Sequence, residues 1–403
     1  MKKFQRNDMI KCDLCHNAPC TQNCKELDPA KLLRSVWFNN EEYIAATLPD
    51  INPCSNCNAS CETSCIHCWE IKIKGLINKL YTIKTKTIKP YEKYIRLKTN
   101  FFWFEMDNPF MLSSSVVWST YDMCARAFEA WWAGVSFKTI CLMDIHEASP
   151  RFAAIKWEDK TIVWFKNIEQ LSDKSLEENL EIFKKLKKDY PNKLIIASIM
   201  WRNEAEREIL AKKVTEAWVD GIELNFSCPN MRDDWLWSDV WQCPDLVELY
   251  TACARKWSKL PILAKLTPNV ANMSSAAEAA KRWWANWISA INTIKSIIPQ
   301  NSCENVVKNQ VCKTAVWWYS WESVKPIALR FISELYNNPN IQWMHLSWMW
   351  WIESRNDAFD FISLWCTTLQ VTTAVMQYWY RIIDDLCSWL NYFLEKMDRE
   401  NIE

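Results

Sequence analysis

The chain has 403 residues, with 48 Lys and Arg against 48 Asp and Glu, and 49% of its residues are hydrophobic. This length suits one large domain plus a small one, and the balanced charge gives no reason to expect a nucleic-acid partner. The N-terminus, MKKFQRNDMIKCDLC, has no apolar signal region, and no run of about 18 apolar residues occurs. We therefore expect a cytoplasmic protein that does not enter a membrane.

The use of Trp and Gly is anomalous, because the chain holds 27 Trp and only 3 Gly. An average Gly usage of roughly 7% predicts about 28. Many Trp stand in turn settings, such as the pairs that end at Trp284, Trp318 and Trp351. Gly belongs in such settings because it alone combines positive φ with close backbone approach. We hypothesise that most Trp are misread glycine codons, as when a reassigned UGA codon is translated as Trp; the alternative is a truly Trp-rich chain. Trp132 is the exception, because Gly134 follows it closely.

Residues 1–75 carry nine of the 18 cysteines. CDLCHNAPCTQNC and NPCSNCNASCETSCIHC contain Cys12, Cys15, Cys20, Cys24, Cys54, Cys57, Cys61, Cys65 and Cys68. In a chain without an export signal, a dense cysteine block indicates metal more often than disulfides. The spacing is compatible with two iron–sulfur clusters and also with two zinc sites of four thiolates each. Residues 1–75 are therefore predicted to form a small metal-binding domain with short helices, followed by a linker over residues 76–100.

From residue 101 to 403, short apolar runs alternate with amphipathic helical segments such as EAEREILAKKVTEA and SSAAEAAKR. The runs are PFMLSSS, GVSFKTI, KLIIASIM, GIELNFS, PILAKLTP, WISAINT, IQWMHLS and TTLQVTTAV. Eight such alternations predict an α/β fold, a (β/α)8 barrel rather than an open sheet. The active site of this fold lies at the carboxyl ends of the strands. The polar ends of the runs are thus candidate site residues: Ser114, Lys138, Asn225, Ser227, Lys265, Asn292, Thr293, Thr372 and Thr373.

The cysteine spacing C-x2-C-x4-C-x3-C, followed by CNASCETSC, resembles the N-terminal iron–sulfur domain of dihydropyrimidine dehydrogenase and of the glutamate synthase small subunit. The resemblance implies two [4Fe-4S] clusters. It assigns Cys12, Cys15, Cys20 and Cys65 to one cluster, and Cys24, Cys57 and Cys61 to the other. For the fourth ligand of the second cluster, Cys68 is the first candidate and Cys54 the second.

The segments NFSCP, AKLTPNV, SAINTIKS, YSWESVKPIALR and SWMWWIES, in this order, resemble the FMN barrel of the dihydropyrimidine dehydrogenase family. The likeness covers about residues 101–397, and dihydroorotate dehydrogenase is the nearest sister family. It implies reduction of the 5,6-double bond of uracil or thymine, or the reverse reaction. The alternative within the same fold is oxidation of dihydroorotate in pyrimidine synthesis.

Site residues follow from the same resemblance. Cys228, between Ser227 and Pro229, would be the general acid, since a thiol with an ordinary pKa near 8.5 keeps its proton at neutral pH; the alternative is a buried packing cysteine. Amide-bearing side chains match the donors and acceptors of a pyrimidine, although an Asn at such a place can equally be a helix cap or turn residue. The implied substrate-binding residues are Asn203, Asn225, Ser227, Asn292 and Thr293. The implied FMN-binding residues are Ser114, Ser115, Lys138, Thr139, Lys265, Ser320, Trp321, Trp350, Trp351, Ile352, Thr372 and Thr373.

Lys138 and Lys265 would place positive charge near the flavin ring, where reduction builds negative charge. The flavin phosphate would rest on backbone N–H groups after strands seven and eight of the barrel, and only Gly at positions 350 and 351 lets the backbone come close enough.

No G-x-G-x-x-G dinucleotide fingerprint precedes the barrel, even with Trp read as Gly. We therefore expect a separate FAD- and NAD(P)H-binding subunit to supply electrons, in an oligomeric assembly. A rival from another class is an electron-relay protein with an inert barrel.

Overall fold

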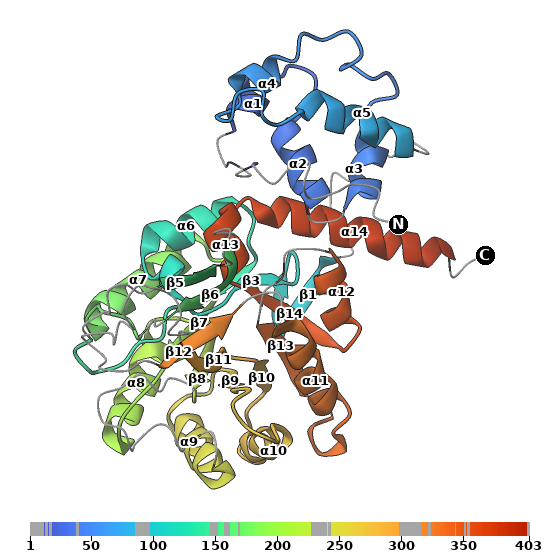
Figure 1. The fold of residues 1–403 in the computed structure, drawn as a ribbon. Helices are drawn as coiled ribbons and strands as arrows, with labels where there is room; N and C mark the ends of the chain where they lie inside the picture. The colour runs from blue at the N-terminus through green and yellow to red at the C-terminus, as the bar shows by residue number, and fades with distance from the viewer. Residues whose placement is uncertain are drawn as a thin grey trace. The chain divides into compact units, whose positions relative to one another are not determined.

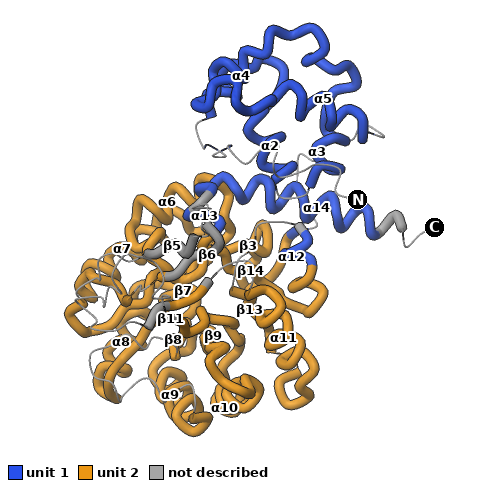
Figure 2. Tube along the Cα trace, in the orientation of Figure 1, with its two compact units in different colours: residues 1–97, 353–359, 374–403 blue, residues 98–352, 360–373 orange. Residues whose placement is uncertain are grey.

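The computed structural model describes residues 12, 15, 18–37, 40–84, 97–145, 152–156, 162–167, 170–226, 240, 243–297, 316–320, 324–342, 344–349, 352 and 355–400. The chain divides into two compact units (Figure 2). The first comprises Met1–Leu97, Glu353–Phe359 and Ala374–Glu403, and the second comprises Lys98–Ile352 and Asp360–Thr373. The C-terminal segment thus belongs with the cysteine-bearing unit, whereas the sequence suggested that it belonged to the barrel.

The second unit is built on a closed barrel of eight parallel strands, which confirms the predicted fold class. All eight apolar runs supply one strand each. In chain order these are β3 (Phe110–Leu112), β4 (Gly134–Ser136), β7 (Leu194–Ile199), β8 (Gly221–Asn225), β9 (Ile262–Lys265), β10 (Trp287–Ala290), β13 (His345–Met349) and β14 (Cys366–Val371). Most of their residues are buried, as expected for parallel strands covered by helices.

Helices lie around these strands (Figure 1). They are η3 (Val116–Trp118), α6 (Tyr121–Glu129), α7 (Leu176–Asp189), α8 (Glu204–Glu216), α9 (Pro244–Trp257), α10 (Ser274–Arg282), α11 (Lys325–Tyr336) and η6 (Pro339–Ile341). Helix α12 (Arg355–Ile362) begins in the first unit and ends in the second, and α13 (Thr373–Tyr378) belongs, after Thr373, to the first unit. Local chemistry sets several of their starts. Helix α7 begins with a capping box, in which Ser175 accepts from the backbone of Glu178 and the Glu178 side chain accepts in return.

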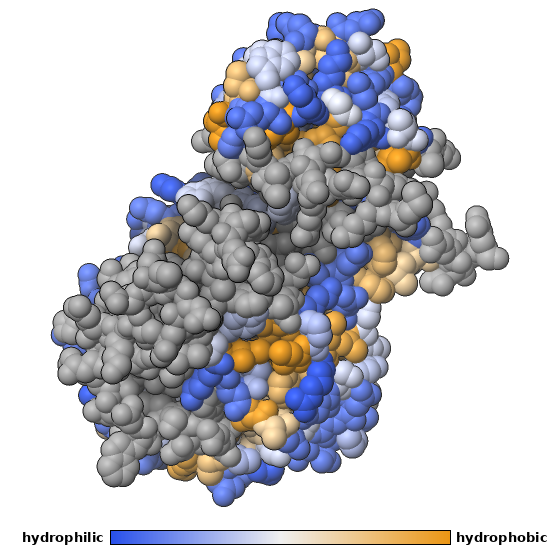
Figure 3. Space-filling model, in the orientation of Figure 1, coloured by the Kyte–Doolittle hydropathy of each residue, from blue (hydrophilic) through white to orange (hydrophobic). Residues whose placement is uncertain are grey.

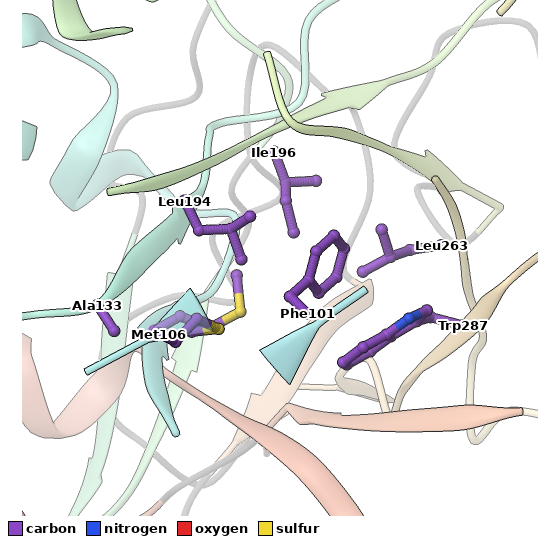
Figure 4. Packing of buried hydrophobic residues seen from close by; sticks show 8 residues of the cluster. Phe101, Met106, Ala133, Leu194, Ile196, Leu263 and Trp287 are labelled. Carbon is purple, nitrogen blue, oxygen red and sulfur yellow. The ribbon is translucent and has the colours of Figure 1, made fainter. Parts of the chain in front are cut away.

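A short antiparallel hairpin of β1 (Thr99–Phe101) and β2 (Phe104–Met106) packs against the amino ends of the barrel strands. Phe101 and Met106 are almost fully buried in one cluster with Leu194, Leu263 and Trp287 (Figure 4). Leu194 and Trp287 are the first residues of their strands. The hairpin therefore fills the end of the barrel opposite the carboxyl ends of the strands.

Four further strands form a separate antiparallel sheet in the order β11-β12-β6-β5. They are β5 (Phe152–Lys156), β6 (Ile162–Asn167), β11 (Ile294–Ile297) and β12 (Val316–Ser320). Each belongs to a segment that leaves a barrel strand at its carboxyl end, after β4 or after β10. This sheet thus belongs to the loops on the side where an active site is expected.

The first unit is helical, as predicted: α1 (Pro19–Gln22), α2 (Pro29–Trp37), α3 (Glu41–Thr47), α4 (Ser60–Ser64), α5 (Ile73–Ile83) and α14 (Ile382–Glu400). Helix α5 covers part of the expected linker, of which residues 85–96 lie outside the described part of the chain. The Nε atom of Arg34 donates to Asp385 at 2.7 Å, and the rings of Tyr43 and Tyr392 lie 5.3 Å apart. Side chains of α14 thus pack against α2 and α3.

Tryptophans occupy most of the left-handed backbone positions. Eight described residues other than Gly have positive φ, and six of them are Trp69, Trp131, Trp218, Trp284, Trp365 and Trp379. After α6, the N–H of Trp131 bonds to Phe128 O at 3.0 Å and that of Trp132 to Ala127 O at 3.1 Å. This is the Schellman pattern, whose left-handed residue is usually Gly. The pattern recurs after α10, where Trp284 is the left-handed residue.

Several of these tryptophans are exposed: Trp218 and Trp284 are each 64% exposed and Trp365 is 73% exposed. Conversely, the indole N–H groups of Trp201, Trp287 and Trp348 are buried and have no hydrogen-bond partner among the described residues. Buried indoles usually find a partner. Both observations support the hypothesis that glycine belongs at most Trp positions.

The coloured surface in Figure 3 is largely hydrophilic, with smaller apolar patches between the polar side chains. Within the described part of the chain, no helix combines the length and apolar character that crossing a membrane requires.

Candidate active site and cysteine clusters

Predicted site residues lie together at the carboxyl ends of the barrel strands. Lys138 and Thr139 follow β4, Asn225 ends β8 and Lys265 ends β9, and all four are at most 7% exposed. The Nδ2 atom of Asn225 donates to Thr139 Oγ1 at 3.0 Å, and Ser114 Oγ lies 3.1 Å from the same oxygen. The structure therefore brings residues from the ends of β3, β4 and β8 into direct contact.

A buried polar network continues from these residues into the barrel. Thr139 Oγ1 lies 2.9 Å from Ser198 Oγ, and Ser198 donates to Glu223 Oε1 at 3.0 Å. Glu223 Oε2 accepts from Ser289 Oγ at 3.1 Å, and Lys265 Nζ lies 3.7 Å from Oε1. Glu223 is completely buried, so the Lys265 ammonium and the two hydroxyls replace the water that a carboxylate would otherwise need.

Of the other proposed substrate-binding residues, two lie after a barrel strand and one lies at the start of a helix. Asn292 and Thr293 follow β10 after Ile291, and Asn292 Oδ1 accepts from the backbone N–H of Thr293 at 2.8 Å. Asn203 is exposed and its Oδ1 accepts from the backbone N–H of Glu206 at 3.0 Å, which makes it the N-cap of α8. The capping interpretation therefore accounts for the oxygen of Asn203.

The residues expected around the flavin phosphate follow the last two barrel strands. Ile352 is buried after β13, and Thr372 and Thr373 are half-buried where β14 passes into α13. Ser115 is buried after β3, and Ser320 ends β12 in the outer sheet. The remaining predicted site residues, Ser227, Cys228, Trp321, Trp350 and Trp351, lie outside the described residues.

One group of cysteines lines a pocket in the first unit. Its walls include Cys12, Cys15, Cys20 and Cys65, together with apolar side chains such as Leu33 and Ile71. Burial raises the pKa of the Cys20 thiol, and the neighbouring thiols of Cys65 and Cys15 raise it further. These four cysteines are the set that the sequence resemblance assigns to the first cluster.

A second group contains Cys24, Cys54, Cys57 and Cys61. Burial, followed by the neighbouring thiols of Cys57, Cys61 and Cys24, raises the pKa of Cys54 to about 12. Burial and the nearby thiols of Cys24 and Cys57 likewise raise the pKa of Cys61 to about 11. Cys54 is 4% exposed, and Cys57 Sγ donates to its carbonyl oxygen at 3.5 Å. Cys68 is exposed. The arrangement therefore favours Cys54 over Cys68 as the fourth member of this group.

Within the described residues, no three His, Cys, Asp or Glu side chains lie close enough together to bind one metal ion. Ligands of a single ion converge on one point. The four thiolates of a cubane cluster bind four different iron atoms, so they lie farther apart around a larger centre. Two groups of four thiols match the four ligands that each cubane needs.

Sequence reasoning missed the polar interior of the barrel, namely Ser198, Glu223, Ser289, Ser347 and Gln370. Each lies in a barrel strand and is fully buried. The signal was present, because Glu223 is an acidic residue inside the apolar run GIELNFS. A charge inside a strand that is buried on both faces indicates an internal ion pair.

Residues 96–394 match the family model described as dihydroorotate dehydrogenase. Over 303 residues the chain is 45% identical to the NAD-dependent dihydropyrimidine dehydrogenase subunit PreA of Escherichia coli (strain K12), a match that covers 73% of this chain and 72% of that protein. It is 31% identical over 314 residues to the chloroplastic dihydropyrimidine dehydrogenase (NADP(+)) of Arabidopsis thaliana, covering 74% and 73%.

A further relative is the catalytic subunit of dihydroorotate dehydrogenase B (NAD(+)) from Pyrococcus abyssi, which is 30% identical over 304 residues, covering 74% of this chain and 94% of that protein. Among solved structures, DHODH from Eimeria tenella in complex with ferulenol superposes with a TM-score of 0.61 at 14% identity, covering 75% of this chain and 86% of that chain. That likeness shows the fold alone.

Proposed function

Because the chain belongs to the dihydroorotate dehydrogenase family, we propose that it is an oxidoreductase acting on the 5,6 carbon–carbon bond of a pyrimidine base. The proposed reaction is reduction of uracil or thymine to the dihydropyrimidine, or its reverse. The observation that carries this proposal is the 45% identity with the PreA subunit over 303 residues. The dihydroorotate dehydrogenase relative is more distant, at 30% identity.

The barrel residues fit a flavin. Lys138 and Lys265 are buried cations at the carboxyl ends of β4 and β9, and a cation there would stabilise the negative charge of a reduced flavin ring. FMN, when bound, supplies the hydride for the pyrimidine carbon. Ser114, Ser115 and Thr139 provide hydroxyl groups in the same region.

We propose that the FMN phosphate binds the backbone N–H groups of residues 350–352 and of Thr372 and Thr373, and that Ser320 and Trp321 also contact the cofactor. This is the recurrent phosphate site of such barrels, after strands seven and eight. Glycine at positions 350 and 351 would let the backbone N–H groups approach the phosphate, whereas indoles would fill that space.

For the substrate, we propose that Asn225, Asn292 and Thr293 bind the amide-like edges of the ring, together with Ser227 and Asn203. Cys228 donates a proton to the carbon next to the one that receives the hydride. A thiol suits this role because it keeps its proton at neutral pH while its ordinary pKa stays close to that pH. In the sequence, Ser227-Cys228-Pro229 follows β8, the strand that ends at Asn225.

For the cysteine unit, we propose two [4Fe-4S] clusters, with zinc as the alternative. The first would be held by Cys12, Cys15, Cys20 and Cys65, which line one pocket. The second would be held by Cys24, Cys57, Cys61 and, in place of Cys68, the buried Cys54. Such clusters transfer single electrons, so the chain would accept electrons from a separate FAD- and NAD(P)H-binding subunit.

A side-by-side assay tests the proposed activity. Purified holoenzyme with its electron-donating partner, or with a chemical reductant, is given uracil, thymine or orotate, and dihydroorotate in the oxidative direction. We expect dihydrouracil and dihydrothymine as products. Turnover confined to orotate and dihydroorotate would establish the alternative instead. Rapid NADH oxidation by the pure chain with uracil, in the absence of any partner, would contradict the separate subunit.

A further inference from the structure

The buried carboxylate of Glu223 fixes the direction of a chain of hydrogen bonds that runs through Ser198 and Thr139 to Asn225. Glu223 Oε1 accepts from Ser198 Oγ at 3.0 Å and Oε2 accepts from Ser289 Oγ at 3.1 Å. An ionised carboxylate only accepts hydrogen bonds, and the Lys265 ammonium 3.7 Å away balances its charge. Ser198 must therefore give its single hydroxyl proton to Glu223.

The consequence passes along the chain one group at a time. Thr139 Oγ1 lies 2.9 Å from Ser198 Oγ, and the proton between them has to come from Thr139, since that of Ser198 is already used. Thr139 then has no proton left for Asn225, 3.0 Å away, so the contact requires the Asn225 amide nitrogen as donor. Because each hydroxyl has only one proton to donate, the orientation of the Asn225 carboxamide follows from the charge of Glu223.

The other side of Glu223 shows the same direction. Ser289 gives its proton to Glu223 and accepts from Gln370 Nε2 at 2.9 Å, and the same nitrogen donates to Ser347 at 2.8 Å. Gln370 Oε1 is buried and has no partner among the described residues. The hydroxyls of Ser289 and Ser347 both accept from the Gln370 nitrogen, so neither donates to the Gln370 oxygen. Donors therefore run toward Glu223 from both sides of the barrel.

We propose that Glu223 is a positioning residue for substrate recognition: it turns the Asn225 carboxamide so that Nδ2 faces Thr139 and Oδ1 is presented to a ring N–H of the pyrimidine. The inference rests on the proposed pyrimidine site. It assigns Asn225 the role of an acceptor, which favours a base with an unsubstituted ring nitrogen over its N-methyl derivative.

The test exchanges the donor and acceptor roles along the chain. In Asn225→Asp, both side-chain oxygens are acceptors and Thr139 has no proton to give, so uracil affinity falls by about tenfold or more. In Glu223→Gln combined with Asn225→Asp, the new amide donates to Ser198, the chain reverses, and Thr139 donates to the carboxylate introduced at position 225. We expect this double variant to recover most of the lost affinity. Dissociation constants come from the change in flavin absorption during uracil titration.

A second route avoids changing a buried charge. Ser198→Ala removes the acceptor of the Thr139 proton, so Ser198→Ala should also rescue Asn225→Asp. Ser347→Ala, on the Gln370 side of the network, is the matched control and should rescue nothing. Thermal unfolding and circular dichroism of every variant report whether it is folded.

Rescue by both Glu223→Gln and Ser198→Ala supports the inference, as does loss of discrimination against N-methyluracil in Glu223→Gln. Failure of both double variants to bind uracil better than Asn225→Asp overturns it, provided that the unmodified protein binds uracil. A flavin-loaded, unmodified protein that gives no response to uracil or thymine instead contradicts the proposed function, and the inference fails with it.

Discussion

Arg34 and Asp385, 351 positions apart in the chain, form a buried ion pair with 2.7 Å between Nε and Oδ2. The Arg34 side chain is 7% exposed and that of Asp385 is fully buried. The pair joins α2, beside the cysteine groups, to the C-terminal helix α14. Burial raises the pKa of Asp385, and the Arg34 guanidinium opposes this rise. Each partner therefore offsets part of the free-energy cost of burying the charge of the other.

Replacing Arg34 with Met should destabilise the first unit by about 3–5 kcal/mol, because the Asp385 carboxyl is left buried without its partner. The free energy of unfolding is measured in urea, with helix content as the signal. Arg34→Met combined with Asp385→Leu should recover most of the loss, since neither charge then remains. A loss below about 1 kcal/mol in the single variant would show that the pair is not the link between α2 and α14.

Trp218→Gly should stabilise the protein by about 1 kcal/mol. Trp218 has φ 63° and is 64% exposed, so the substitution relieves a left-handed strain of roughly 1–2 kcal/mol and loses little packing. Trp103 is 72% exposed and is not among the residues with positive φ, so Trp103→Gly is the matched control. It should give no gain in the midpoint of thermal unfolding.

Mass spectrometry of peptides from the native protein tests the same hypothesis directly. We expect glycine at positions 69, 131, 218, 284, 365 and 379, where the backbone is left-handed, and at positions 350 and 351 beside the proposed phosphate site. Intact tryptophan at 350 and 351 would contradict the misread-codon hypothesis and would place indoles where the phosphate should bind.

Cys54→Ser should lower the iron content of anaerobically purified protein from about eight atoms per chain to about four, or to the content of an altered cluster, because each cubane needs four protein ligands. Cys68→Ser is the matched control and should keep about eight. Iron and acid-labile sulfide are assayed together with the electron paramagnetic resonance spectrum of the reduced protein. The opposite pattern would restore Cys68 as the ligand, and zinc without sulfide in the unmodified protein would refute the clusters themselves.

Cys228→Ala should reduce turnover of uracil by about 10²–10⁴-fold while leaving flavin reduction by the donor intact, because a general acid acts only in the proton-transfer step. Cys243→Ala, in the cap of α9, controls for the loss of a thiol. Unchanged turnover in Cys228→Ala would favour a different acid, and an inactive unmodified protein with reducible clusters would favour the electron-relay alternative.

The barrel could be predicted from the sequence because its signal is local. Each strand is a short apolar run followed by polar residues, and the helices between them are amphipathic, so all eight strands were found. The division of the cysteines into two groups came from the family resemblance, because spacing alone does not bring Cys65 to Cys12, Cys15 and Cys20. The choice between Cys54 and Cys68 as the fourth member of the second group depends on their burial and on how α1 and α4 pack. Cysteine spacing does not encode either.

Other features depend on contacts between distant segments. The sheet of β5, β6, β11 and β12 escaped prediction because its strands pair across more than one loop. The motif YSWESVKPIALR drew attention to Tyr319 and Ser320 without indicating that they end a strand. The attachment of α14 to the cysteine unit depends on the pairing of Arg34 with Asp385, which no local pattern indicates. Asn203 had two interpretations, and only the structure showed its oxygen capping α8.

The central claim is that this chain carries a flavin that exchanges electrons with a pyrimidine base. The most direct measurement is the visible spectrum of anaerobically purified protein, recorded as isolated, after reduction with dithionite, and after addition of uracil. We predict flavin and iron–sulfur bands that bleach on reduction, and flavin absorption that returns with uracil as dihydrouracil forms. A protein without flavin bands, or a reduced flavin that uracil and thymine leave bleached while orotate reoxidises it, would contradict the claim.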